Sequence, residues 1–524
     1  MTTASADDSP RSSLGMPLVA LIMVAAVANL NLAVANVALP SIGQAFDASQ
    51  TALNMIAIGF SLGLAASVLY LGALGDRYGR KGILLTGVIL SIPASLLAGF
   101  AWNEWVLAGA RIFGGVAAGM AYPTTLALIT AIWTGANRTK AIALWSAIGG
   151  GVMSLAPLVS GVLLLSRPWG SVFLITLPLA IIALVLALKY VPAHLDESTE
   201  PVDHLGGVLS VIMVATLVIS INFAPVPGAM RYAAILFGVT VVAALLFVRR
   251  QRTAPNPLYD LKVARRRVFW VAAVGGMIVF GSLMGAMFIG QQYLQNVLGY
   301  DTALAGVAPL PAAIAMVLVA GLSAKFVENR GSRLTLLLGF GILFVGFVLM
   351  LVLWQESTGL AAVLVTYLVC GFGVGFAGTP ASRSLTNSVP VDRAGMASAT
   401  ADLQRDLGGA VMQAVLGALL TAGYASSMGK QVAAAPEPVS QDVVAELQKS
   451  FASATETAQQ YPQYATAIVQ AAKEAFLAGA NWAYAAGVVF VGIGALLIRW
   501  RFPGATEENE LIASYQREDE GAPA

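Results

Sequence analysis

The sequence has little charge. Asp, Glu, Lys and Arg make up 11% of its 524 residues, whereas about a quarter of a soluble protein is charged. Hydrophobic residues make up 58% of the chain, and apolar stretches of about 20 residues, enough to cross a bilayer core, recur along its length. Every backbone polar group must be paired inside a bilayer, so these stretches are predicted to be helices. The low charge excludes an ordinary soluble domain and predicts an all-α integral membrane protein.

Several kinds of functional residue are scarce as well. The single cysteine, Cys370, excludes a disulfide framework. The two histidines, His194 and His204, lack the spacing of metal ligands, so no metal site is expected. The sequence has neither a phosphate-binding P-loop nor a nucleophile elbow, so it predicts no ATP motor, no enzyme and no cofactor. A net charge of +2 gives no indication of a nucleic-acid partner.

Fourteen membrane spans are predicted. They cover residues 16–39, 52–74, 83–101, 105–133, 141–165, 171–188, 205–223, 232–248, 268–294, 303–326, 334–354, 360–377, 396–422 and 475–498. This pattern divides the chain into a tail (1–15), a six-helix bundle (16–190), a linker with two extra helices (191–266), a second six-helix bundle (267–499) and a second tail (500–524). Two pseudo-symmetric six-helix bundles around a midplane site are typical of a secondary transporter.

The distribution of basic residues predicts the orientation. Loops after even-numbered spans carry most of the Lys and Arg residues, seven of them between positions 249 and 267, whereas short loops after odd-numbered spans carry little beyond Arg167 and Arg231. The positive-inside rule therefore places both termini in the cytoplasm, with the protein in the cell membrane. The acidic tail after residue 504 is predicted to be disordered.

One loop on the extracellular side, residues 423–474, is long. Val443, Leu447, Phe451 and Ala454 follow one another near helical spacing, so a helical segment is expected there. It would be either a solvated connector or a lid over the outer vestibule.

The strongest motif follows the second span and reads Gly72-Ala-Leu-Gly-Asp-Arg-Tyr-Gly-Arg-Lys81. A glycine at its start allows close helix packing, and Gly79 permits a tight turn. The run resembles the loop signature of the major facilitator superfamily at every defining position. The resemblance implies a latch that holds the two halves in the outward-open state, whereas a plain topology anchor is the alternative. The latch residues are Gly72, Asp76, Arg77, Gly79, Arg80 and Lys81.

Two further motifs resemble this family. Arg111, within the fourth span, begins Arg-Ile-Phe-Gly-Gly, which is similar to the family's R-x-x-Q-G and implies a role in proton transfer; the alternative is snorkelling to the outer interface. The fifth span carries Gly151, Pro157 and Gly161, with Ala156 and Ser160 in place of two glycines of the antiporter signature. That resemblance implies an exporter, and a purely structural kink is the alternative.

The fourteen-span layout resembles the drug:proton antiporter group, which includes multidrug, antiseptic and tetracycline exporters. Members commonly carry an Asp in the first span, and Asn31 replaces it here. An amide cannot carry a proton, so coupling must use another carboxylate. Asp402 and Asp406 share one face of the thirteenth span, and Arg405 can pair with Asp402. Either one of these acids carries the coupling proton, or the cluster is a static ion-paired group at the cytoplasmic gate.

The sequence thus predicts a secondary transporter, a monomer in the lipid bilayer, that exports amphipathic small molecules or drugs in exchange for protons. Candidates for the lining of the substrate cavity are Asn31, Asn36, Tyr122, Gln291, Gln292 and Gln413. Two alternatives remain open: an exporter or flippase of a native metabolite or envelope lipid, and a non-transporting sensor or assembly partner.

Overall fold

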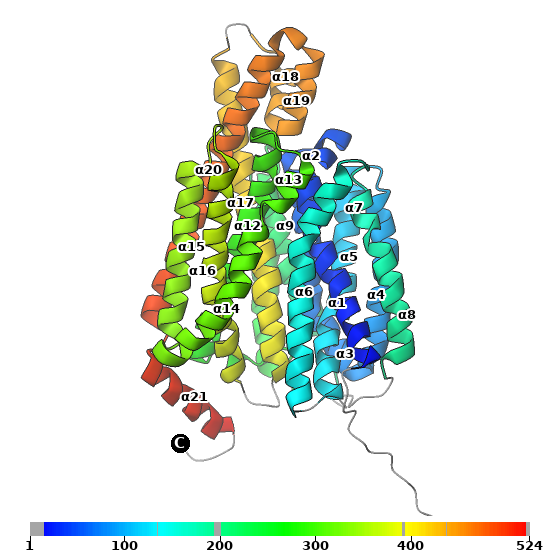
Figure 1. Cartoon of the computed structure of the whole chain (residues 1–524), viewed down its shortest axis with the longest axis vertical. Coiled ribbons are helices and arrows are strands. Elements are labelled where there is room, and N and C mark those ends of the chain that lie inside the picture. Colours follow the sequence, from blue (N-terminus) through cyan, green and yellow to red (C-terminus); the bar gives the residue numbers. More distant parts are fainter. Residues whose placement is uncertain (1–14, 134, 193–200, 390–393, 436–437, 520–524) are drawn as a thin grey trace, which may run out of the picture.

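The computed structural model describes residues 15–133, 135–192, 201–389, 394–435 and 438–519 (Figure 1). The described residues form helices and connecting turns without a β-strand, which confirms the all-α prediction. Thirteen of these helices are long and apolar enough to cross a membrane. They match the predicted spans other than the fifth. In place of the fifth lies α6 (Gly135–Leu164), whose described apolar part is Ile148–Leu164.

Helix α3 is the most deeply buried helix of the first bundle. The helices of this bundle are α1 (Met16–Ala33), α2 (Ala35–Phe46), α3 (Gln50–Tyr78), α4 (Arg80–Gly99), α5 (Glu104–Ile132), α6, α7 (Ser171–Leu174) and α8 (Thr176–Tyr190). Two glycines bring α3 and α5 into backbone contact: a Cβ on Gly63 would lie 2.1 Å from the Ile112 carbonyl oxygen, and one on Gly115 would lie 2.1 Å from that of Phe60. Such small residues permit the close packing that stabilises helix pairs in lipid.

The two extra helices, α9 (His204–Phe223) and α10 (Met230–Thr253), pack on each other, and α9 also contacts α3. Asp203 caps α9: its carboxylate accepts hydrogen bonds from the Gly206 N–H at 3.1 Å, Arg250 at 2.8 Å and Gln251 at 3.0 Å. Burial would raise the pKa of Asp203, but these hydrogen bonds outweigh it and the pKa is lowered. The capped pair is joined to the second bundle by the short helix α11 (Leu261–Ala264).

The second bundle consists of α12 (Arg267–Gln292), a π-helical turn (Tyr293–Val297), α13 (Thr302–Val307), α14 (Leu310–Arg330), α15 (Ser332–Leu353), α16 (Leu360–Asn387), α17 (Ala394–Ala433) and α20 (Ala465–Arg501). Its core includes Trp354, which stacks on Tyr293 with 4.9 Å between ring centroids and meets Tyr367 and Tyr484 edge-on. These rings are fully buried, and they join the π-helical turn, the end of α15, α16 and α20.

The long loop forms a helical hairpin. Helices α17 and α20 continue past their predicted spans and carry α18 (Gln441–Lys449) and α19 (Phe451–Gln460), which stand above the bundle in Figure 1. This confirms the predicted helical segment in that loop. We call this end of the molecule the hairpin end.

The prediction of a disordered tail was wrong. Residues Ala505–Asp519 form α21, which lies at the opposite, tail end of the molecule (Figure 1). Its acidic residues have partners that the tail's composition does not reveal. Arg267 pairs with Glu507 and Arg266 with Asp519, each at 2.5 Å, and the buried Glu508 accepts a hydrogen bond from Ser384. These partners lie more than a hundred residues away in sequence, so tertiary contacts hold α21 in place.

Candidate functional site

A charged cluster lies where α17 meets α5. The Arg405 guanidinium is 3.3 Å from Asp402 Oδ1 and 3.4 Å from Asp406 Oδ1, and its centre lies 5.3 Å from the centroid of the Tyr122 ring. Asp406 is 2% exposed, and its second oxygen, Oδ2, has no hydrogen-bond partner among the described residues. One cation therefore faces two carboxylates in a buried place, and the cluster includes Tyr122 from the other bundle.

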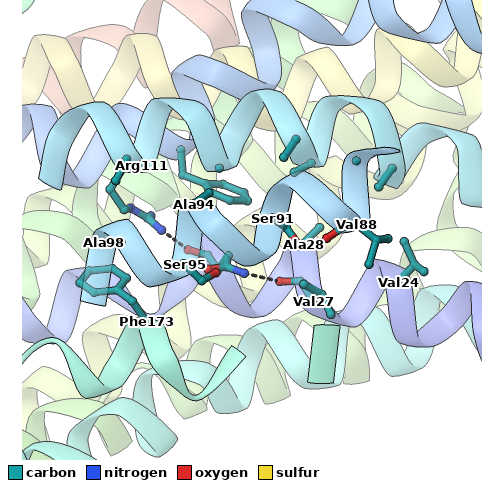
Figure 2. Close-up of a pocket in the computed structure, with 18 residues that line it drawn as sticks. Val24, Val27, Ala28, Val88, Ser91, Ala94, Ser95, Ala98, Arg111 and Phe173 are labelled. Carbon is teal, nitrogen blue, oxygen red and sulfur yellow. Dashed lines mark hydrogen bonds between the residues drawn. The ribbon is translucent and has the colours of Figure 1, made fainter. Parts of the chain in front are cut away.

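Arg111 occupies a separate cavity inside the first bundle (Figure 2). Its side chain is 2% exposed, so it does not snorkel to an interface. Its Nη1 donates to the Asn31 carbonyl oxygen at 2.5 Å and its Nε to that of Ile56 at 3.4 Å. The guanidinium lies 5.0 Å from the Phe60 ring centroid and 5.6 Å from that of Phe173, both within cation–π range.

The fifth-span motif lies at a contact between the two bundles. A Cβ on Gly161 would lie 2.1 Å from the Thr302 carbonyl oxygen, and one on Gly306 would lie 2.4 Å from that of Pro157. The Thr302 hydroxyl donates to the Gly161 carbonyl at 2.8 Å. Helix α6 thus packs backbone-to-backbone against α13, which explains why the contact needs glycine. Gly151 has open space around its Cα.

Other polar contacts join the bundles at the same hairpin end. Gln50 donates to Gln292 at 3.1 Å, and Asn54 donates to Thr421 at 3.2 Å. Gln295 donates to the carbonyl oxygen of Val37 at 2.9 Å. These contacts link α2 and α3 to α12 and α17, so this end of the molecule is closed in the described conformation.

The hairpin itself adds a bridge to the first bundle. Lys449, the last residue of α18, pairs with Asp47 at the end of α2. Burial would lower the pKa of Lys449, but the hydrogen bond and charge of Asp47 outweigh it and the pKa is raised. Asp47 and Lys449 are 402 residues apart in sequence, so no local sequence signal could have predicted this ion pair.

Two polar contacts of the loop motif at the tail end lie inside the first bundle. Arg80 Nε is 2.9 Å from Asp76 Oδ1, and Lys81 donates to the Leu188 carbonyl oxygen at 3.1 Å. Gly79 has a φ of 106°, which suits glycine and gives the predicted tight turn. A Cβ on Gly72 would meet nothing within 4 Å, so the expected close packing at this glycine is absent from this conformation.

The predicted cavity residues do not gather in one place. Tyr122 joins the charged cluster and Asn31 the Arg111 cavity, whereas Gln292 is part of the closed end. The Gln291 side-chain amide donates to the Ala305 carbonyl oxygen at 2.9 Å, and the Gln413 side-chain amide donates to the Met284 carbonyl oxygen at 3.5 Å. Asn36 is half-buried on α2.

Comparison with known proteins agrees with this architecture. The family model described as Major Facilitator Superfamily matches residues 21–412. The multidrug efflux pump LfrA of Mycolicibacterium smegmatis is 35% identical over 402 residues, which cover 76% of this chain and 79% of LfrA. The methyl viologen resistance protein SmvA of Salmonella typhimurium is 29% identical over 495 residues, covering 92% of this chain and 96% of SmvA.

Solved structures share the fold. A bacterial homologue of the human lysosomal transporter Spinster, in an inward-facing and unoccupied conformation, superposes with a TM-score of 0.65 at 15% identity, over 96% of this chain and 99% of that one. Fold and comparisons together define a multi-pass membrane transporter of small molecules, and not an enzyme. The chain belongs to the major facilitator superfamily.

Proposed function

We propose that this protein exports amphipathic small molecules, including drugs, across the cell membrane in exchange for protons. The charged cluster of Asp402, Arg405 and Asp406 is the observation that carries the proposal. Similarity to LfrA and SmvA supports the substrate class, because their names describe multidrug efflux and methyl viologen resistance. In this proposal both termini are cytoplasmic, the hairpin end is extracellular, and the transporter acts as a monomer.

The cluster has the composition that a proton carrier needs. With both carboxylates ionised, Arg405 leaves one negative charge uncompensated in a buried environment, where an isolated charge is costly. A proton on one carboxyl group removes that charge. When the bundles separate at the hairpin end or the tail end, water reaches the cluster and the proton exchanges with that side. Each proton that moves inward across about 100 mV supplies roughly 2.3 kcal/mol.

Alternating access follows from the contacts at the two ends. The close packing of Gly161 on Thr302 and the polar contacts around Gln292 support a conformation that is closed on the extracellular side. We propose that these contacts separate when the protein opens outward. The loop motif around Asp76 and Arg80 would then hold the two bundles together at the tail end and act as the latch.

An accumulation assay tests this function. Cells that express the protein should retain less of a lipophilic cationic dye than cells that express, at the same level, the double variant Asp402→Asn with Asp406→Asn. A protonophore should abolish the difference. Unchanged retention across a broad panel of cationic and neutral dyes would contradict drug export. It would favour the alternative of a native metabolite or lipid as substrate.

A further inference from the structure

The buried Arg111 has no negatively charged partner in the part of the chain that the structure describes. No carboxylate among the described residues lies within salt-bridge distance of its guanidinium, and its Nη2 atom is buried without a hydrogen-bond partner there. The two backbone carbonyls and two aromatic rings around it provide only partial negative charge. A fixed cation in a low-dielectric bundle is strongly disfavoured unless a counter-charge accompanies it. Arg111 therefore needs a partner that the described part of the chain does not supply.

The cavity beside Arg111 is lined by donors as well as by apolar groups. It lies between α1, α4 and α5, with Arg111, Ser95 and Phe173 toward one end and Val24 and Val88 toward the other (Figure 2). The Asn31 amide uses one of its N–H groups on the Val27 carbonyl oxygen at 3.1 Å and has a second N–H to donate.

Ser95 can supply another donor. Its hydroxyl is 3.0 Å from the Thr176 hydroxyl, and Thr176 also donates to the Phe173 carbonyl oxygen at 2.7 Å. The Thr176 hydroxyl proton thus has an acceptor in either arrangement, and the Ser95 hydroxyl is free to donate its own proton into the cavity. A guanidinium, an amide N–H and a hydroxyl all donate, which is the donor set that an anion requires.

The size of the cavity restricts the anion. Its volume is about 20 Å³, and roughly 10–15 Å³ is enough for one water molecule. This space has room for a monatomic ion such as chloride. We propose that the Arg111 cavity binds one chloride ion, which serves as the counter-ion of Arg111 within the first bundle. The ion is structural and is not transported, so the proposal is independent of the direction of transport and of the proton carrier.

Chloride-dependent stability tests the proposal directly. The purified, detergent-solubilised protein is heated while chloride is titrated to about 0.15 M against gluconate at constant ionic strength. The melting temperature should rise saturably with chloride and with bromide, because an ion that binds only the folded state stabilises it by mass action. Gluconate, which is much larger than a monatomic ion, serves as the reference anion.

Two asparagines on α1 provide a matched pair of variants. Asn31→Asp places a carboxylate beside Arg111 and should weaken chloride binding at least tenfold. Asn29→Asp adds the same charge two residues away, where the side chain does not line the cavity, and should keep the dependence on chloride. Arg111→Gln should abolish the dependence if that variant folds, and the asparagine pair carries the test if it does not.

Three outcomes would overturn the proposal. Equal melting temperatures in chloride and gluconate for the unaltered protein would show that the cavity holds water only. A chloride effect that persists in Asn31→Asp, or one that disappears equally in Asn29→Asp, would show that chloride binds elsewhere. None of these results bears on proton-driven export, because melting is measured without a gradient or a substrate.

Discussion

Adding one methyl group to Gly161 should open the hairpin end. Its new Cβ would lie 2.1 Å from the Thr302 carbonyl oxygen, a backbone atom that can move only if α6 and α13 separate. Overpacking of this kind costs typically 1–3 kcal/mol, and the cost falls only on conformations in which the two helices touch. The ratio of open to closed molecules should therefore rise by about 5- to 150-fold. Gly151→Ala, on the same helix with open space around it, should leave the ratio unchanged.

Cysteine labelling measures this ratio. Ser160, next to Gly161 on α6, is fully buried, so Ser160→Cys should react slowly with a membrane-impermeant maleimide added outside the cell. The one native cysteine, Cys370, is buried and should give little background. Labelling should become faster when Gly161→Ala is added and stay slow with Gly151→Ala. Equal rates in the two double variants would refute the argument that backbone contact at Gly161 closes this end.

Two further predictions concern ion pairs outside the membrane spans. Lys449→Gln removes the hairpin's ion pair with Asp47 and should raise the rate of maleimide labelling at Ser160→Cys by about 1.5- to 5-fold, because a partly exposed ion pair contributes about 0.2–1 kcal/mol. Lys473→Gln breaks an equally exposed ion pair within the second bundle and should leave this labelling rate unchanged. Asp203→Ala should lower the free energy of unfolding by about 0.5–2 kcal/mol at pH 7 through the lost cap and the lost pair with Arg250. The folded-state pKa of Asp203 is lowered, so its ionised form stabilises the fold above the ordinary pKa of about 3.9, and this stabilisation disappears as the pH falls through the lowered pKa. Urea unfolding at pH 7 and at an acidic pH should show that the difference in the free energy of unfolding between the unaltered protein and the variant shrinks in acid. A difference that does not change with pH would contradict the lowered pKa.

Hydropathy predicted most of the fold because each span is long enough to be recognised locally. It could not predict where spans are interrupted. The first span divides into α1 and α2 around Val34, and the ninth ends in a π-helical turn after Gln292. These interruptions are set by packing between helices, which a sliding count of apolar residues does not measure.

The site residues show the same limit. Charges inside apolar stretches marked Arg111, Asp402 and Asp406 in the sequence, because such charges are rare in membrane spans. The predicted pair of Arg405 with Asp402 is present, because three residues separate them on one helix. Contacts between helices were not predictable: Tyr122 approaches Arg405 from a helix almost 300 positions earlier, and no carboxylate among the described residues lies beside Arg111. The contact of Gly161 with Thr302 likewise depends on how two bundles meet and not on any local pattern.

Transport into proteoliposomes with an imposed pH gradient tests the central claim most directly. With an acidic lumen, inside-out transporters should concentrate an uncharged substrate about tenfold per pH unit for each proton exchanged. At least one of the two single variants, Asp402→Asn or Asp406→Asn, should lose this accumulation. Asp442→Asn, on the exposed face of the hairpin, should retain it. Full gradient-driven accumulation by both Asp402→Asn and Asp406→Asn would contradict the proposal that this cluster carries the coupling proton.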